Sequence, residues 1–135
     1  MALLIWGNQY SVGVSALDKQ HANLFCVLNE LNDAMKSGQS KMVLGPLLDE
    51  LMAYTRHHFA DEERRMKEAG YPGLETHRIQ HEALTRQVVE FAARFKSGEV
   101  ALSIDLMEFL RNWLTGHIQG ADKEYAPWMS KQAVQ

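Results

Sequence analysis

The sequence predicts an all-α protein, and more narrowly an antiparallel up-down-up-down four-helix bundle preceded by an irregular N-terminal arm. In four segments, inward-facing residues recur at alternating intervals of three and four, a pattern typical of helices packed against one another at a shallow angle. Glycine and proline interrupt the pattern between these segments, where they can end a helix. The strict alternation that indicates a β-strand is absent, so the sequence favours an all-α class.

The predicted helices cover approximately residues 16–37, 41–69, 74–96 and 103–119, with a short C-terminal extension after the last. Helices of this length joined by short loops pack as an antiparallel bundle. The inward-facing positions, helix by helix, are Leu17, His21, Leu24, Leu28, Leu31 and Met35; Leu44, Leu48, Leu51, Thr55, His58 and Glu62; His77, His81, Leu84, Val88, Phe91 and Phe95; and Ser103, Leu106, Leu110, Trp113 and His117. We expect residues 1–135 to form a single domain, because this length is typical of one.

Residues 1–15 lack the helical period and are expected to form the arm. Trp6 and Tyr10 in this arm are available to pack on the bundle. Ser15 and Asp18 have the spacing of a capping box, which would satisfy free backbone N–H groups at the start of the first helix.

Composition and charge exclude several classes of function. The net charge is −3 with neutral histidines, so no basic surface for nucleic acid or an anionic membrane is expected. No apolar run approaches the ~20 residues that span a bilayer, and the apolar stretch 1–6 is too short for a signal peptide. The single cysteine, Cys26, excludes an internal disulfide and a thiolate cluster, and we expect it to be buried and inert. A cytoplasmic location is therefore expected.

Histidines are concentrated on the inward faces of the predicted helices. Five of the six occupy inward positions together with Glu62: His21, His58, His77, His81 and His117. Burying these groups in an apolar core is costly unless each has a partner, and a bound metal would satisfy them all. His57 lies one residue off the inward face, so we expect it either at the surface or in contact with a ligand, without binding the metal itself.

The spacing of these groups places them at one level of the bundle. The pairs His58/Glu62 and His77/His81 are four residues apart, so each pair lies on one side of its helix. In an antiparallel bundle, the starts of the first and third helices share an end with the ends of the second and fourth. Taken singly, each residue could be an ordinary hydrogen-bonded core residue, but together they favour two metal ions. Imidazole with carboxylate suits Fe, Zn, Cu or Ni.

Asp122 is a seventh candidate ligand, five residues after His117. In a regular helix this spacing turns its side chain about 140° away from the histidine. Gly116 and Gly120 lower the resistance to a local bulge that would bring the two side chains together. A solvated aspartate at a helix end is the simpler interpretation of this residue alone, and only the other six groups favour a role in metal binding.

Motifs of other metal and catalytic sites are absent. The Glu-x-x-His motif, which ferritin-like di-iron bundles use twice, does not occur in the chain. The zincin motif, the nucleophile elbow and the phosphate-binding glycine loops are absent as well.

The sequence resembles the hemerythrin family, and in particular its stand-alone bacterial members, over nearly the whole chain. The matching stretches are Trp6…Tyr10-Ser-Val-Gly-Val, Leu17-Asp-Lys-Gln-His21, Tyr54…His58-Phe-Ala-Asp-Glu62-Glu63…Met66, Gly70-Tyr71-Pro72, His77-x-x-x-His81 and His117-Ile-x-x-x-Asp122. The resemblance implies two iron ions per chain, with O2 as their ligand. One iron would take three histidines, His77, His81 and His117. The other would take His21 and His58, which leaves one of its positions open.

The resemblance further implies that Glu62 and Asp122 bridge the irons together with an oxo or hydroxo group. Positions that match the family's oxygen pocket are large and apolar: Leu24, Phe59, Trp113, Leu114 and Ile118. The implied function is reversible O2 binding for storage, delivery or scavenging, without enzymatic turnover and with a possible protein recipient of the O2. Alternatives are an oxygen- or redox-sensing module, an enzyme that processes NO or peroxide, and a bundle that metal merely stabilises.

Overall fold

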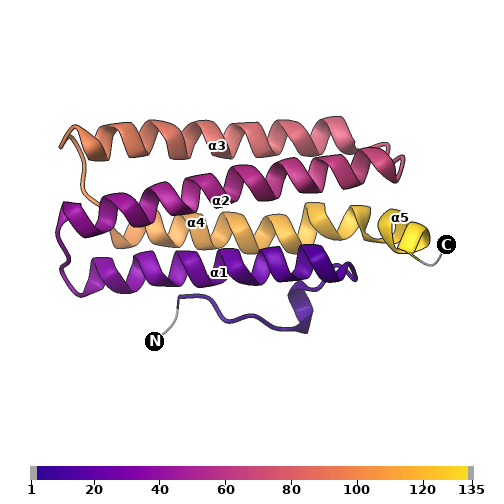
Figure 1. Ribbon diagram of the computed structural model, residues 1–135, viewed down its shortest axis with the longest axis horizontal. Helices are drawn as coiled ribbons and strands as arrows, with labels where there is room; N and C mark the ends of the chain where they lie inside the picture. The colour runs from indigo at the N-terminus through magenta and orange to yellow at the C-terminus, as the bar shows by residue number, and fades with distance from the viewer. Residues whose placement is uncertain (1–2, 134–135) are drawn as a thin grey trace.

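The computed structural model of the protein describes residues 3–133, with side chains as far as residue 129, and this part of the chain contains no strand. Four long helices run alongside one another in alternating directions (Figure 1), which confirms the predicted all-α four-helix bundle. They are α1 (Ser15–Lys36), α2 (Lys41–Glu68), α3 (Leu74–Lys96) and α4 (Ile104–His117). No helix within residues 3–133 is long and apolar enough to cross a membrane.

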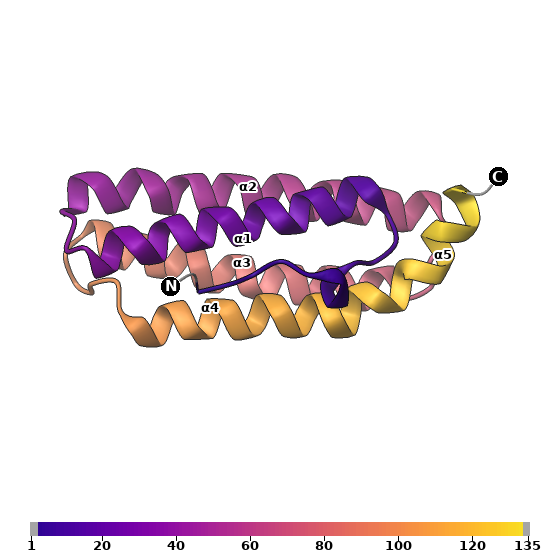
Figure 2. The ribbon, with the colours of Figure 1, turned by 90° about the horizontal axis from the view of Figure 1, so that it is seen from below.

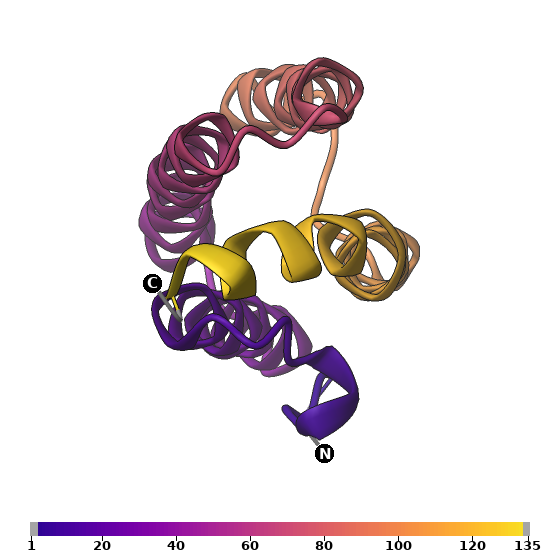
Figure 3. The same ribbon diagram turned by 90° about the vertical axis from the view of Figure 1, so that its right-hand side faces the viewer.

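The C-terminal extension expected after the fourth helix is itself helical. A π-helical turn, η2 (Ile118–Asp122), follows α4 directly and leads into α5 (Lys123–Ala133). Because the backbone changes direction at this turn, α5 bends across the end of the bundle instead of continuing the line of α4 (Figures 2 and 3). Tyr125 and Met129 of α5 are buried there against Leu17 and Met66.

The inward positions of the four helices form the core. Nearly all of them are buried or half-buried, including every predicted histidine ligand. Ser103 is the exception, because it is exposed and precedes the first turn of α4. Its hydroxyl oxygen accepts a hydrogen bond from the backbone N–H of Leu106, so this serine caps the helix.

The predicted capping box at the start of α1 is wrong. Ser15 is already the first helical residue, and the preceding residue provides no side-chain cap. Asp18 instead reaches back to the arm, where its carboxylate accepts hydrogen bonds from the backbone N–H of Val12 at 2.8 Å and the hydroxyl of Ser11 at 2.6 Å. A negative charge in the first turn also interacts favourably with the helix dipole.

The N-terminal arm packs on the bundle as expected. Trp6 and Tyr10 both meet Phe25 of α1, with ring centroids 5.3 and 5.0 Å apart. Two hydrogen bonds of 2.8 Å between the backbone of Leu4 and the side-chain amide of Asn29 hold the arm further along α1. Figure 2 shows the arm running back along the bundle. The predicted burial of Cys26 is wrong, because its side chain lies on the exposed side of α1.

Candidate metal centre

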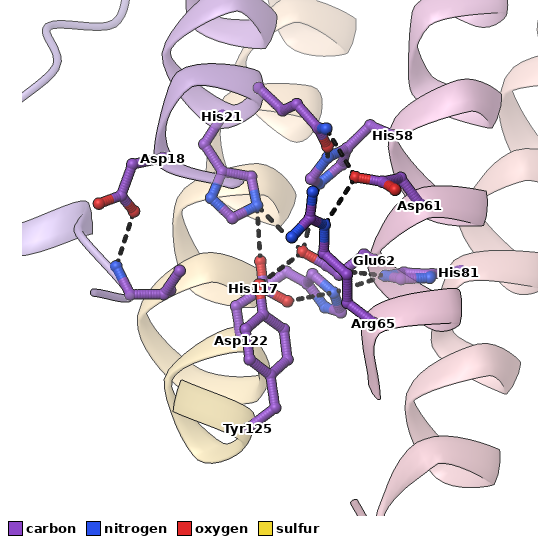
Figure 4. Close-up of polar contacts among 12 residues, drawn as sticks. Asp18, His21, His58, Asp61, Glu62, Arg65, His81, His117, Asp122 and Tyr125 are labelled. Carbon is purple, nitrogen blue, oxygen red and sulfur yellow. Dashed lines mark hydrogen bonds and ion pairs between the residues drawn. The ribbon is translucent and has the colours of Figure 1, made fainter. Parts of the chain in front are cut away.

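All seven predicted ligands lie together at one level of the bundle, and each is buried. They come from four helices and the π turn, and Figure 4 shows His21, Glu62, His81 and Asp122 converging from different elements. His57 is exposed and takes no part in the cluster, as expected.

A first group of possible ligand atoms comprises five side chains: Glu62, His77, His81, His117 and Asp122. Their ligand atoms all lie within 4.8 Å of one another. The Nε2 atom of His117 lies 3.0 Å from that of His77 and 3.1 Å from that of His81. Oε1 of Glu62 lies 3.1 and 3.0 Å from the same two histidines, so the atoms surround one small volume.

A second group adjoins the first and comprises His21, His58 and Glu62. Oε2 of Glu62 lies 3.2 Å from Nε2 of His21 and 3.3 Å from Nε2 of His58. Asp122 spans both groups in the same way, with Oδ1 3.0 Å from Nε2 of His77 and Oδ2 3.1 Å from Nε2 of His21. Each carboxylate therefore directs one oxygen to each group, which is the arrangement of two bridging ligands.

Hydrogen bonds alone do not satisfy this cluster. An imidazole Nε2 either donates one hydrogen or accepts one, yet that of His117 faces two further Nε2 atoms and a carboxylate. Both carboxylate oxygens of Asp122 are buried without a hydrogen bond of acceptable geometry. A cation in each group would satisfy them. Ligands about 2.1 Å from an ion and at right angles to each other are about 3.0 Å apart, which agrees with the spacing observed here. The side chains therefore fit a pair of cations with nitrogen and oxygen ligands.

The π turn explains how Asp122 joins the cluster. It inserts one extra residue into the helical turn, so residues five apart return to the same side of the helix. Oδ1 of Asp122 consequently lies 3.1 Å from Nε2 of His117. A Cβ atom at Gly116 or Gly120 would meet no neighbouring atom within 4 Å, so the space around these two glycines is open. The sequence-based expectation of a local bulge is confirmed.

Burial and close charges shift the pKa values of the cluster in the metal-free protein. Burial disfavours the charged forms, but close contacts with the carboxylates of Asp122 and Glu62 and their negative charges outweigh it and raise the pKa of His21 and His77 to about 9. The same histidines hold the pKa values of Glu62 and Asp122 well below their ordinary range, again against the effect of burial. Without metal, protons on histidine supply the positive charge that the carboxylates require.

Side chains behind the histidines fix their orientation. Nδ1–H of His58 donates a 2.6 Å hydrogen bond to Oε1 of Gln20, whose amide in turn donates to Asp61 at 2.8 Å. Nδ1–H of His81 donates to the carboxylate of Glu63 at 2.8 Å. Because these bonds use Nδ1 as the donor, Nε2 of each ring is free to bind a metal. The two contacts differ in charge, because His58 faces a neutral amide and His81 a carboxylate.

Tyr125 of α5 contacts the cluster through Glu62. Its hydroxyl donates a 2.7 Å hydrogen bond to Oε2 of Glu62, and its side chain is fully buried (Figure 4). Burial, followed by the charges of Glu62 and Asp122, raises its pKa far above the ordinary value, so it remains a neutral donor.

Sequence reasoning assigned no role to Gln20, Glu63 or Tyr125. Gln20 and Glu63 each adjoin a predicted ligand in the sequence, which is a signal that could have identified them. Tyr125 lies after the π turn, where the alternating pattern has ended, so its position depends on a backbone feature that the pattern does not describe.

An apolar cavity of about 40 Å³ lies next to the histidines, and we call it the inner cavity. Four of the five residues predicted for the oxygen pocket line it: Leu24, Phe59, Trp113 and Leu114. The fifth, Ile118, is fully buried but does not line it. Phe59 stacks on His81 and Trp113 on His117, with ring centroids 3.7 and 4.4 Å apart, so these rings separate the cavity from the ligands.

Comparison with known proteins agrees with this geometry. The family model described as "Hemerythrin HHE cation binding domain" matches residues 12–129. A bacteriohemerythrin from Stenotrophomonas maltophilia is 40% identical over 126 residues, which cover 93% of this chain and 81% of the relative. One from Methylococcus capsulatus is 33% identical over 131 residues, which cover 96% and 99% of the two chains. A crystal structure of wild-type hemerythrin superposes with a TM-score of 0.92 at 32% identity, covering 96% of this chain and 99% of that one. The chain therefore belongs to the hemerythrin family.

Proposed function

We propose that this protein binds O2 reversibly at a pair of iron ions held by the seven buried ligands, and that it stores, delivers or scavenges oxygen. Hemerythrins are in general oxygen-binding proteins, and the His/Glu/Asp cluster suits a di-iron site and oxygen binding. When bound, the iron pair would supply the electrons that hold O2 and take them back on its release. The role of the protein is to hold the ligands and to control what reaches them.

The division of the ligands supports two irons of different coordination. Five side chains surround one position and four surround the other, because Glu62 and Asp122 each direct one oxygen to each position. The position near His21 and His58 therefore has fewer protein ligands, which leaves room there for a small exogenous ligand. The buried hydroxyl of Tyr125 donates to Oε2 of Glu62, the oxygen that faces this position, and so helps to hold the bridging carboxylate.

The observation that carries the proposal is the apolar inner cavity, which only the rings of Phe59 and Trp113 separate from two of the ligands. Reversible binding requires that water and proton donors be kept away, since both promote release of reduced oxygen species. Among the described residues that line the cavity, Thr55 carries the one hydroxyl, which donates to the backbone carbonyl of Leu51 at 2.7 Å. The lining contains no general acid or base within the described part of the chain, and this favours oxygen binding over turnover.

The proposal is tested by measuring O2 uptake of the anaerobically reduced, iron-loaded protein. We expect one O2 for each pair of irons and recovery of the O2 under argon. Leu114→Ala should enlarge the cavity, admit water and accelerate autoxidation several-fold, whereas Leu47→Ala, at a half-buried leucine outside the cavity, should not. Continuous O2 consumption without recovery would contradict the proposal.

A further inference from the structure

A second apolar cavity, of about 190 Å³, lies among α2, α3 and α4, and we call it the outer cavity. Leu48 and Leu110 form a buried part of its wall, whereas Gln87 and the 42% exposed Phe109 lie at its rim. It is therefore close to solvent on the side of the bundle between α3 and α4. Neither the metal ligands nor their hydrogen-bond partners line it.

The outer cavity adjoins the inner cavity. Val88 and Leu110 line both, so the two cavities meet at these side chains. Beyond them, the inner cavity extends to Phe59 and Trp113, which stack on two of the histidine ligands. The outer cavity thus adjoins the inner cavity, which in turn reaches the rings stacked on the ligands.

The chemistry of the lining selects what can enter. Apart from the amide of Gln87 at the rim and the satisfied hydroxyl of Thr55, the walls of both cavities are hydrocarbon and aromatic, with no charged residue. Apolar cavities of about 150 Å³ remain dry and bind small apolar molecules such as xenon or benzene. A diatomic gas gains favourable contacts in such a space, whereas water and ions lose theirs.

We propose that the outer cavity is a docking site for O2, from which the gas passes between Val88 and Leu110 into the inner cavity. The identity of the gas rests on the proposed function, whereas affinity for a small apolar molecule follows from the cavity alone. Val88 is half-buried, and its side chain is small and apolar. A gas molecule that passes it therefore has to break neither an ion pair nor a hydrogen bond.

A hollow beside Gly116 is the competing route. It is lined by Gln80, Asn112 and His117, among others, and is open to solvent. One of the ligands, His117, lines it directly, but the polar groups of Gln80 and Asn112 in its lining make it more favourable to water than the two apolar cavities. The two routes predict different effects of substitutions at Val88, which lines only the apolar cavities.

Xenon tests the docking site independently of iron. Crystals of the protein pressurised with xenon should show an atom in the outer cavity, and Leu106→Phe, which adds a ring to the cavity wall, should remove it. Val43→Phe, at an exposed position of α2 outside both cavities, should leave it unchanged. The absence of xenon from the outer cavity of the unmodified protein would overturn the proposal.

Stopped-flow mixing of the reduced, iron-loaded protein with O2 tests the passage. Val88→Phe should slow the association and the dissociation of O2 by the same factor. We expect a factor of about ten, the lower end of the range over which association rates vary among variants of one site. Affinity should stay constant, because a passage acts equally in both directions. Leu106→Phe should slow the same two rates, and provides the test if Val88→Phe does not fold. Unchanged rates in both variants would overturn the passage, whereas a protein that binds xenon but no O2 would contradict only the proposed function.

Discussion

The Nε2 atom of His117 lies 3.1 Å from Oδ1 of Asp122, and the π turn between them makes this contact possible. The two oxygens of this buried carboxylate also lie 3.0 Å from His77 and 3.1 Å from His21, yet neither has a hydrogen bond of acceptable geometry. The wider turn replaces the regular α-helical hydrogen bonds of the backbone, and it directs a second carboxylate toward the histidines.

Removal of this carboxylate should disrupt the site. We expect Asp122→Ala to reduce the iron content from two ions per chain to one or fewer, because the substitution removes a ligand from both positions at once. Elemental analysis of protein reconstituted with Fe(II) checks this. Glu124→Ala, two residues away on the exposed side of α5, is the matched control and should keep both ions. Full iron content in Asp122→Ala would exclude this aspartate as a required ligand.

The contact between Tyr125 and Glu62 should contribute to stability. Tyr125→Phe keeps the ring but leaves Oε2 of Glu62 without its hydroxyl donor, and a hydrogen bond to a charged group contributes about 1.5–3 kcal/mol. The free energy of unfolding in urea should fall by about this amount. Tyr54→Phe is the control, since no hydrogen bond from its hydroxyl occurs among the described residues; an equal loss in both variants would argue against a specific role for Tyr125.

The hydrogen bonds from Nδ1 of His58 and His81 should influence the affinity of the site for metal. Gln20→Ala removes the acceptor of the 2.6 Å bond from His58, and Glu63→Ala removes that of the 2.8 Å bond from His81. Loss of such a partner lowers metal affinity by about 10–100-fold. Competition with a chelator measures the change, and Gln39→Ala at an exposed position is the reference. Unaltered affinity in both variants would show that the histidines hold their orientation without these partners.

The stability of the metal-free protein should change with pH in a defined direction. Burial opposes protonation of His21 and His77, but Asp122 and Glu62 raise the pKa of each from 6.5 to about 9. The stabilisation from these two groups is therefore complete below pH 6.5 and is lost as the pH rises toward 9. The lowered pKa values of Glu62 and Asp122 add stability that is present above their ordinary range and lost in acid.

Urea unfolding of the chelator-treated protein should therefore show a decline in stability from pH 6.5 to 9. Metal binding requires neutral imidazole, so titration with Zn(II) at pH 7 should release protons, which calorimetry in buffers of different ionisation enthalpy detects. Stability that rises over this pH range would contradict the assignment of protonated histidines.

Much of this structure follows from the spacing of side chains along the sequence. The intervals of three and four identify the four helices, and the same intervals carry His21 and His77 to one level, because antiparallel packing fixes which helix ends meet. The bulge before Asp122 could be predicted only because six other candidate ligands share this level, since the two glycines merely make it easier to form.

The rest depends on contacts that a periodic pattern does not encode. Tyr125 reaches Glu62 only because the π turn redirects α5, and the size of that change is a property of the folded backbone. The capping box failed because Asp18 found stronger partners in the arm, whose path is irregular. Cys26 is exposed although its neighbours Phe25 and Val27 are buried, because adjacent residues of a helix point in different directions.

The visible absorption spectrum of the iron-loaded protein tests the central claim most directly. The anaerobically reduced protein should be nearly colourless, should gain a charge-transfer band when air is admitted, and should lose it again when O2 is removed. Two irons per chain should accompany the spectrum. A protein that stays colourless in air, or one whose band appears once and does not disappear on deoxygenation, would contradict reversible O2 binding at this site.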